Sequence, residues 1–418
     1  MSTSSIVDKD DGDDIVDVCI VGAGLSGAYA AYLLRDYSVA VVDARCRVGG
    51  RLLTVDGGVD LGGSWIWPRS EYVMKRFIDQ LGINTVDQYV DGESFARAPD
   101  GRIHSIPPGG AGRYVACGGG AVRVSGGAAT MVHTLLQNDD HDIYCNLSIH
   151  LGMRVVRIEH SGDVMRVVYV EAEEINNEIT KTIRCRTVIL AAPPKVLANS
   201  ICFHPPLAKV KIDSMLATPT WMEDYGKVAV SFPLNWWRRL NMSAVSIDQK
   251  GPVSTWWEAC SGNDGDGLYP TLAGFVTATG ANKLQKLDST EALHDHVIDS
   301  LTAIYCINAS DMGMQVHEVG VKINGTADKD GISVVKGGIT VTYKSWLKDG
   351  HTNVSSSYDV DFACDYGDVN LRESVRSIFF AGTETSHGSG HMEGAIISAQ
   401  RVADEAIQYL RLMGTTTR

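Results

Sequence analysis

The sequence predicts an α/β protein that contains a doubly wound domain with parallel strands near the N-terminus and antiparallel strands farther along the chain. Two patterns predict this class. Near the N-terminus, short apolar strands flank a helix, as in the βαβ units of parallel sheets. Farther along, residues 145–192 alternate in polarity and are rich in Val and Ile, which is typical of antiparallel strands. The 418 residues are enough for two or three domains.

The N-terminal unit can be followed element by element. Val16–Val21 is a short apolar strand, and the Gly-rich segment Gly22–Gly27 predicts a tight turn after it. A helix is expected over Leu25–Asp36, and then a second buried strand over Val39–Val42 that ends at Asp43. Together these elements predict one complete βαβ unit.

Periodicity and composition predict further elements along the chain. The segment 82–128 is rich in Gly and Pro, so we expect it to run over the surface or to line a site. A last strand is expected to end at Phe379-Phe380. Helical spacing of apolar residues predicts helices over Glu71–Leu81, Ala129–Leu136 and Gly394–Leu410.

Charge and composition argue against several classes of protein. Lys and Arg number 37 against 50 Asp and Glu, and the net charge of −13 without a basic run disfavours binding to nucleic acid or anionic membranes. No apolar stretch is long enough to span a bilayer, and the N-terminus lacks the features of a secretory signal, so a cytoplasmic location is expected. The nine cysteines form no C-x-x-C pair, so no metal site is expected.

The turn Gly22-Ala23-Gly24-Leu25-Ser26-Gly27 has the G-x-G-x-x-G spacing of dinucleotide-binding turns. Glycines at these positions let the turn close and let the backbone approach a pyrophosphate at the N-terminus of the next helix. Asp43 ends the following strand, where a carboxylate accepts both hydroxyls of an adenosine ribose. Gly22, Gly24, Gly27 and Asp43 are therefore predicted to bind a cofactor.

Two more Gly-rich segments follow this unit. The first, Asp43-Ala44-Arg45-Cys46-Arg47-Val48-Gly49-Gly50-Arg51, offers guanidinium groups for a pyrophosphate and glycines for close backbone approach. A unit that binds a nicotinamide dinucleotide does not need such a segment after the acid, whereas a longer flavin dinucleotide runs onward past it. The second segment is Asp60-Leu61-Gly62-Gly63-Ser64-Trp65.

These three motifs together resemble those of the flavin-containing amine oxidases, which include monoamine, polyamine and L-amino-acid oxidases. The C-terminal part agrees, with Phe380-Ala381-Gly382-Thr383-Glu384-Thr385-Ser386 followed by Gly390-His391-Met392-Glu393-Gly394-Ala395. The resemblance covers roughly residues 15–70 and 185–410. It implies a Rossmann-like FAD-binding domain with an inserted mixed-sheet substrate domain, and FAD as the cofactor.

The C-terminal motif also has a physical interpretation. A helix that opens at Met392 offers N–H groups and positive potential, which would stabilise negative charge at the pyrimidine end of a flavin. Gly382 would permit close approach, and Glu384 would bind ribityl or ribose hydroxyls. The cofactor-binding set implied by the motifs and the resemblance is completed by Arg45, Gly50, Arg51, Gly62, Gly63, Ser64, Trp65 and Val156.

The resemblance suggests how the chain divides into domains. Residues 1–14, with five Asp and one Lys, are expected to form a disordered acidic tail. The FAD-binding domain is predicted to comprise residues 15–70, 124–202 and 357–418. The substrate domain is predicted to comprise residues 71–123 and 203–356.

Four residues are implied around the reacting centre. Lys227 matches a family lysine near flavin N5 whose ammonium helps reduced flavin react with oxygen, and Trp346 matches a tryptophan packed beside both. Tyr358 and His391 stand at the two positions of the family's aromatic cage, where a histidine replaces the usual second tyrosine and adds a titratable group. The structural alternatives are a surface lysine at a strand end and ordinary packing of the rings. Ser357 stands where mammalian monoamine oxidases attach the flavin through cysteine, so non-covalent FAD is expected.

The resemblance implies an FAD-dependent amine oxidase. Hydride would pass from the amine α-carbon to flavin N5, the imine would hydrolyse to an aldehyde and ammonia or a smaller amine, and O2 would become H2O2. One alternative is a related flavin oxidase or desaturase acting on an amino acid, a tetrapyrrole or a polyene; an amino acid would need a cation such as Arg113. A flavin-holding scaffold without turnover is a third hypothesis, and the motifs at both ends of the chain argue against it.

The expected partners are a small-molecule amine and O2. Glu258, beside Trp256-Trp257, either attracts a second cationic group of a polyamine or is a surface carboxylate, and the second interpretation is favoured. The sequence does not specify which amine is oxidised. It also leaves the oligomeric state open, with a homodimer as one of the alternatives.

Overall fold

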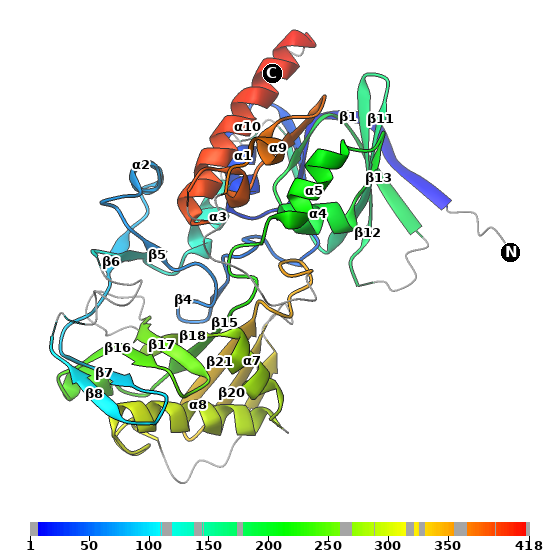
Figure 1. Ribbon diagram of the computed structural model, residues 1–418. Helices are drawn as coiled ribbons and strands as arrows, with labels where there is room; N and C mark the ends of the chain where they lie inside the picture. Colours follow the sequence, from blue (N-terminus) through cyan, green and yellow to red (C-terminus); the bar gives the residue numbers. More distant parts are fainter. Residues whose placement is uncertain are drawn as a thin grey trace, which may run out of the picture. The chain divides into compact units, whose positions relative to one another are not determined.

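The chain folds into two compact units, each of which is built from separated segments and described here by itself (Figure 1). The first comprises Met1–Arg51, Met131–Trp221 and Gly350–Arg418, and the second comprises Leu52–Thr130 and Met222–Asp349. The computed structural model describes residues 7–108, 110, 119–137, 144, 146–173, 179–259, 270–287, 289–314, 322–325, 331–354, 366–388 and 390–414.

The first unit contains an eight-stranded sheet with the order β10-β2-β1-β13-β12-β11-β14, in which β22 also pairs with β13. β10, β2, β1, β13 and β22 pair in parallel, whereas β11, β12 and β13 pair antiparallel. The predicted α/β class with a doubly wound parallel part is therefore confirmed. The strands are β1 (Val7–Val21), β2 (Ser38–Val42), β10 (Asn146–His150), β11 (Met153–Ser161), β12 (Val164–Glu171), β13 (Ile179–Leu190), β14 (Cys202–His204) and β22 (Ile378–Phe380).

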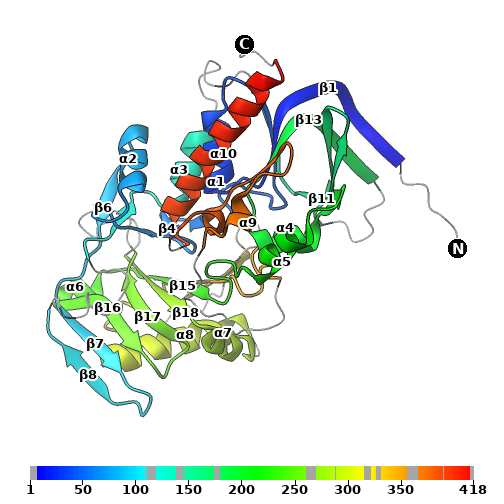
Figure 2. The ribbon, with the colours of Figure 1, turned by 45° about the horizontal axis from the view of Figure 1, so that its top comes forward.

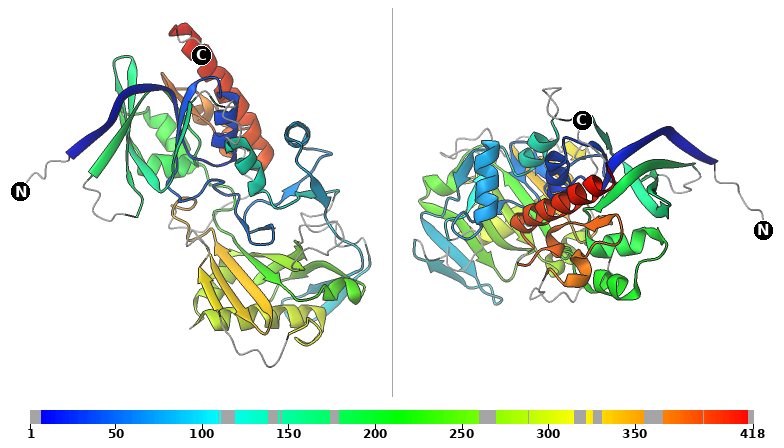
Figure 3. Two further views of the ribbon diagram at one scale, coloured as in Figure 1. Left: turned by 180° about the vertical axis from the view of Figure 1, so that it is seen from behind. Right: turned by 90° about the horizontal axis from the view of Figure 1, so that it is seen from above.

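Helix α1 (Leu25–Leu33) and the long helix α10 (Met392–Leu412) pack against each other in this unit (Figure 3). Every residue of α1 from Leu25 to Ala31 is buried, as expected for a helix that is apolar all round. α10 buries one stripe at helical spacing, as its sequence predicts: Ile396, Ala399, Val402, Ala403, Ala406 and Leu410. The other helices are α3 (Ala129–Leu136), α4 (Pro194–Ser200), α5 (Lys209–Ala217) and α9 (Val369–Arg372).

The first strand begins earlier than the sequence predicts. β1 starts at Val7, pairs with β13 over Val7–Asp10, and resumes its pairing at Ile15 after an irregularity. The expectation of a disordered tail over residues 1–14 is therefore wrong from Val7 onward, while residues 1–6 lie outside the described residues. Strand pairing uses backbone groups, so it tolerates an acidic sequence when a long partner strand is available.

The second unit contains a nine-stranded mixed sheet with the order β19-β20-β21-β15-β18-β17-β16-β7-β8. Only the β16–β7 pair is parallel among the pairings within its described strands. The strands are β7 (Glu93–Arg97), β8 (Ile103–Ile106), β15 (Gly226–Ser231), β16 (Met242–Asp248), β17 (Val253–Glu258), β18 (Thr271–Val276), β19 (Lys322–Gly325), β20 (Ile332–Lys336) and β21 (Ile339–Ser345).

Helix α8 (Thr290–Tyr305) covers one face of this mixed sheet (Figure 2). Its buried residues Val297 and Leu301 belong to one apolar core together with the fully buried Trp236 and Trp256. Trp236 packs edge to face with Phe232, Trp237 and Tyr305, as aromatic quadrupoles favour. α7 (Ala278–Gln285) and α6 (Trp236–Arg239) complete this part.

The segment 82–128 is more regular than its Gly and Pro content suggests. Besides β7 and β8 it contains β6 (Thr85–Asp87) and β9 (Val122–Val124), and β9 pairs with β5 (Trp65–Ile66). Its predecessor α2 (Tyr72–Leu81) confirms the predicted helix and ends at Gly82 in the left-handed conformation. Because glycines occupy the turns, strands of three to five residues escape recognition from composition.

The chain passes between the two units at 51/52, 130/131, 221/222 and 349/350. The sequence patterns place these passages at 70/71, 123/124, 202/203 and 356/357. The first passage lies earlier because β3 (Thr54–Val55) pairs with β4 (Val59–Asp60) and β5 pairs with β9, all within the second unit.

Candidate functional site

The Gly-rich turn after β1 leads into α1, and packing inside the first unit explains two of its glycines. Gly22 has a φ of 111°, which L side chains rarely adopt, and its N–H donates to Val42 O at 2.8 Å. A Cβ on Gly27 would lie 1.9 Å from Gly22 O. These two positions need glycine to close the turn, whatever the turn binds.

Gly24 is different, because nothing in the described part of the chain requires glycine there. Its φ of −73° and ψ of −179° are open to any residue, and an added Cβ would lie 3.9 Å from Gly49 O, an ordinary van der Waals contact. Gly24 is also the N-cap of α1 and offers no side-chain acceptor to the first turn. The turn thus keeps space and helix-end N–H groups where dinucleotide folds hold a pyrophosphate, so the residues fit such a cofactor.

The second Gly-rich segment packs directly against this turn. Gly49 N–H donates to Ala23 O at 2.8 Å, and Gly49 forms an isolated bridge with Gly24. Gly50 has a φ of 57°, and a Cβ there would lie 3.2 Å from Gly24 Cα. The two glycine motifs therefore form one surface, as the dinucleotide interpretation expects.

Asp43 lies at the end of β2, and its carboxylate is held by backbone donors. Oδ2 accepts from Ala23 N at 2.7 Å, and Oδ1 accepts from Arg45 N at 2.8 Å. The carboxylate is thereby fixed beside the turn with lone pairs remaining on both oxygens, since each can accept two hydrogen bonds. The side chain of Arg45 donates from Nη2 to Thr352 Oγ1 at 3.0 Å.

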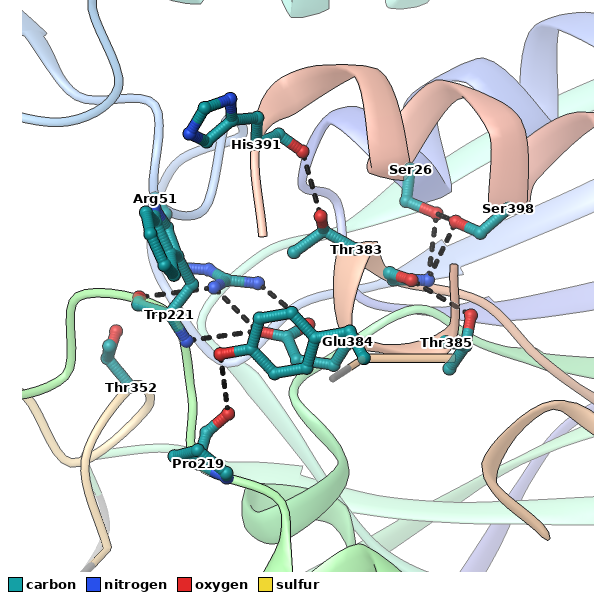
Figure 4. A network of polar contacts seen from close by, with 12 residues as sticks. Ser26, Arg51, Pro219, Trp221, Thr352, Thr383, Glu384, Thr385, His391 and Ser398 are labelled. Carbon is teal, nitrogen blue, oxygen red and sulfur yellow. Dashed lines mark hydrogen bonds and ion pairs between the residues drawn. The ribbon is translucent and has the colours of Figure 1, made fainter. Parts of the chain in front are cut away.

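Arg51 and Glu384 form an ion pair that joins the second Gly-rich segment to the C-terminal motif (Figure 4). Arg51 Nη1 and Nη2 donate to Glu384 Oε1 and Oε2 at 2.7 and 3.1 Å. Glu384 is 0% exposed, so the pairing keeps a buried carboxylate from carrying an uncompensated charge. Arg51 and Glu384 were each predicted to bind the cofactor, and here their charges neutralise each other.

The first and last motifs of the chain are tied together inside the first unit. Gly382 N lies 3.2 Å from Ser26 Oγ and 3.1 Å from Ser398 Oγ, and the two hydroxyls are 3.2 Å apart (Figure 4). Ser26 belongs to the first turn and Ser398 to α10. Gly382 has a φ of 109°, which again requires glycine.

The N-terminus of α10 lies next to this point. Met392 opens the helix, and His391 is its N-cap with extended backbone and no side-chain bond to the first turn. The His391 carbonyl accepts from Thr383 Oγ1 at 2.8 Å. Val156, half-buried, is the extra residue at a bulge in β11. Tyr358 and Ser357 lie outside the described residues.

Lys227 lies on β15 in the second unit, and it is not a surface lysine. Its side chain is buried, and Nζ donates to Gly62 O at 2.7 Å and to Ser64 Oγ at 2.6 Å. Burial lowers the pKa of Lys227 to about 7, Asp60 opposes this shift, and Arg123 adds to it. The third motif thus binds the candidate oxygen-reacting lysine directly, with Gly63 exposed between the two contacts.

Aromatic rings surround this lysine. Its Nζ lies 5.1 Å from the ring centroid of Trp257 and 5.7 Å from that of Phe275, within the range of cation–π contact. The ring of Trp65 packs at a tilt of 56° against Trp257, with the centroids 4.6 Å apart, and its Nε1 donates to Gln88 Oε1 at 2.9 Å. Sequence reasoning missed Trp257, Phe275 and Gln88. Phe275 pairs with Lys227 across β15 and β18, a register that only the fold reveals.

Trp346 binds the same motif as Lys227. Its indole Nε1 donates to Leu61 O at 2.8 Å, and its backbone N–H donates to Tyr225 O at 3.0 Å. Asp60, at the start of the motif, accepts from Thr54 Oγ1 at 2.6 Å and from Ala128 N at 2.9 Å. Burial raises the pKa of Asp60. The second unit therefore gathers Lys227 and Trp346 around residues 60–65.

Glu258 is neither a surface carboxylate nor available to a second cation. It is 1% exposed and accepts from Arg238 Nη2 at 2.6 Å, from Arg238 Nε at 2.9 Å and from Trp237 Nε1 at 2.7 Å. The guanidinium of Arg238 also stacks on Tyr89, 4.1 Å from the ring centroid. The favoured interpretation of Glu258 as a surface carboxylate is therefore wrong. Its partners Trp237 and Arg238 lie 21 and 20 positions away in sequence, so no local pattern indicated them.

Replacing Arg238 by Met should lower the free energy of unfolding by about 3–5 kcal/mol, because Glu258 would keep a buried charge without its partner. Chemical denaturation with fluorescence detection measures this change. Lys75→Met is the matched control, since it removes an exposed ion pair with Asp79 and should cost about 0–1 kcal/mol. Equal losses for the two variants would contradict a buried-charge role for the pair.

The βαβ turn, the fixed acid at the end of β2 and the glycine contacts define a dinucleotide-binding fold. A model of NAD(P)-binding Rossmann-like domains matches residues 20–81. A model of flavin containing amine oxidoreductases matches residues 111–407. The chain belongs to this family of flavin-containing amine oxidoreductases, which confirms the resemblance seen in its motifs and identifies it as an enzyme.

Similarity to individual proteins is consistent with membership of this family. The chain is 25% identical to amine oxidase [flavin-containing] B of Bos taurus, over 94% of this chain and 86% of that protein. Its fold is similar to that of cyclohexylamine oxidase from Brevibacterium oxydans IH-35A, with a TM-score of 0.67, 18% identity and coverage of 95% and 100%. A putrescine oxidase bound to putrescine has a TM-score of 0.64 at 19% identity, with coverage of 96% and 100%.

None of the helices in the described segments is both long and apolar enough to cross a membrane.

Proposed function

We propose that this protein is an FAD-dependent oxidase of amines with O2 as the electron acceptor. The observation that carries the proposal is Lys227: a buried amine, with a pKa lowered to about 7, held by Gly62 and Ser64. Desolvation of the Lys227 charge destabilises the fold, and a role in the reaction would account for this cost. Perturbed pKa values cluster at functional sites, so this buried amine, held by the third motif of a flavin oxidoreductase, supports an oxygen-reacting role.

The first unit supplies the residues that would hold FAD. Gly24 and the N-terminus of α1 would receive the pyrophosphate, and Asp43 would accept the ribose hydroxyls. The N-terminus of α10 at Met392 would stabilise negative charge on the isoalloxazine ring. Ser357 cannot form a thioether, so we propose that the cofactor is held without a covalent bond.

Bound FAD would supply an acceptor at N5 for the hydride of the amine α-carbon and a route for the two electrons to O2; the products would be H2O2 and an imine, which water would hydrolyse to an aldehyde and ammonia or a smaller amine. In this proposal protonated Lys227 stabilises the negative charge that develops on oxygen. Trp346 holds the segment at Leu61 to which Lys227 is also anchored. Tyr358 and His391 would form the walls on either side of the amine.

The contacts of Glu258 favour an amine with a single nitrogen. A polyamine would need a carboxylate with charge to spare, and the acid that the sequence offered for this purpose is neutralised by Arg238. Glu384 is likewise neutralised by Arg51. We therefore propose a monoamine substrate.

Anaerobic mixing of the flavin-loaded protein with primary monoamines, polyamines and L-amino acids tests this function. We expect monoamines to bleach the flavin absorbance, and air to restore it with formation of H2O2. Dithionite reduction of the same sample is the control, because it shows that the bound flavin can be reduced and bleached. Bleaching by an amino acid alone, or by no amine while dithionite still works, would contradict the proposal.

A further inference from the structure

The indole of Trp221 lies next to the imidazole of His391. His391 stands at the position of the aromatic cage where the family usually carries tyrosine. The ring centroids lie 5.6 Å apart with an interplanar angle of 68°, so the two rings form a corner (Figure 4). Both side chains are only half-buried. No sequence motif pointed to Trp221, which ends the second segment of the first unit.

The backbone of Trp221 is held by the Arg51–Glu384 ion pair. Its N–H lies 3.3 Å from Glu384 Oε1, and its carbonyl accepts from Arg51 Nη1 at 3.3 Å (Figure 4). Because one buried pair contacts both polar groups of the same residue, Trp221 has little freedom to move away from the C-terminal motif. This is the arrangement expected of a ring that must be in place before a ligand binds.

The indole is also fixed by its neighbours. A Cβ on Gly390 would lie 2.6 Å from Trp221 Cγ, so the glycine before His391 lets the backbone lie flat against the ring. Tyr366 packs edge to face with Trp221 at 6.5 Å, and its hydroxyl donates to Pro219 O at 3.1 Å. Gly390 and Tyr366 thus pack against Trp221, while Trp221 and His391 both remain half-buried.

We propose that Trp221 is a specificity-determining residue, whose indole forms with His391 an aromatic corner that binds the aryl or cycloalkyl group of a monoamine. An imidazole alone offers less apolar surface than the usual phenol, and the indole restores it. A flat apolar group fits a corner of two rings, and a cationic nitrogen gains most from the face of a tryptophan. This inference rests on the proposed amine oxidation.

The test uses the flavin-loaded protein and two readouts. Benzyltrimethylammonium serves as a binding probe, because its nitrogen has no lone pair to support hydride loss, and its Kd follows from the change in flavin absorbance. Anaerobic reduction by benzylamine and by butylamine gives the ratio of their kcat/KM values. We expect Trp221→Leu to weaken the probe about tenfold and to lower the benzylamine-to-butylamine ratio about tenfold.

Tyr409→Ala is the matched control. It removes a half-buried ring of α10 that packs edge to face with Phe379 of β22. Tyr409 lies 17 residues beyond Met392 and so about 25 Å along α10. We expect wild-type Kd and ratio for this variant. Trp221→Phe keeps an aromatic face and should change both readouts only two- to threefold. It also serves as the test if Trp221→Leu does not fold.

Unchanged Kd and ratio in the folded Trp221 variants, with benzylamine still bleaching the wild type, would overturn the aromatic corner and leave the oxidase function intact. Conversely, a wild type that no amine bleaches but that binds the probe through Trp221 would overturn the function and keep the corner. Equal changes in Tyr409→Ala and Trp221→Leu would also overturn the proposal, because they would show general destabilisation.

Discussion

Replacing Lys227 by Met should slow the reaction of reduced flavin with O2 on the order of 100-fold, while flavin reduction by the amine changes less than about threefold. The ammonium is the group that would stabilise negative charge on oxygen, and it takes no part in hydride loss from the amine. Stopped-flow absorbance measures the two half-reactions separately. Equal slowing of both half-reactions would contradict the assigned role.

The same step should depend on pH in a defined direction. Because burial lowers the pKa of Lys227 to about 7, the side chain is protonated below this pH and neutral above it. Reoxidation should therefore slow as the pH rises through about 7 in the wild type, and it should show no such transition in Lys227→Met. A rate that rises with pH in the wild type would mean that the neutral amine is the active form.

The lowered pKa also has a consequence for stability. An unfolded lysine keeps its proton up to about pH 10.5, whereas folded Lys227 loses it near 7. The unfolded state therefore binds more protons between these values, and the contribution of Lys227 to folding stability rises with pH across this window. In Lys227→Met this part of the pH dependence should disappear, which thermal unfolding at several pH values can measure.

Lys344→Met separates Lys227 from buried lysines in general. Lys344 is the register partner of Lys227 on β21, is equally buried, and donates to Asp349 at 2.8 Å. Its loss should lower stability, since Asp349 would be left buried without its partner, but reoxidation of the folded variant should match the wild type. A comparable loss of oxygen reactivity would indicate that the field of the whole region matters rather than Lys227 alone.

Features that depend on neighbours in sequence were predictable. The turn at Gly22–Gly27, the acid at Asp43 and the helix after Gly390 each follow from spacing within one or two elements, and the structure places them as expected. Local backbone geometry determines these features. At Gly22, for example, the turn needs a φ of 111°, which residues other than glycine rarely adopt. The family follows from such motifs because several of them occur in the right order.

Features that depend on distant partners were not predictable. Glu258 looked like a surface acid because Arg238 approaches it only through α6 and β17. Trp221 carried no signal, since its position depends on contacts with residues more than 150 positions away on either side. The acidic start of the chain resembled a tail because only pairing with β13 makes Val7 part of a strand.

The difference between Gly24 and Gly27 gives the sharpest test of the cofactor site. Gly24→Ala should leave the unfolding free energy of the flavin-free protein within about 1 kcal/mol of wild type, because the added Cβ would make an ordinary contact of 3.9 Å with Gly49 O and the backbone conformation suits any residue. The added methyl group would instead occupy the space proposed for the pyrophosphate. We therefore expect FAD affinity to fall at least about tenfold, measured by fluorescence titration of the flavin-free protein.

Gly27→Ala should behave in the opposite way. Its Cβ would lie 1.9 Å from Gly22 O, so the turn must open, at a cost of about 3 kcal/mol of stability even without flavin. Gly350→Ala, where nothing lies within 4 Å, should change neither quantity. If Gly24→Ala bound FAD as the wild type does, the space at this glycine would not be the pyrophosphate site. The glycine at position 24 would then be explained neither by cofactor binding nor by packing.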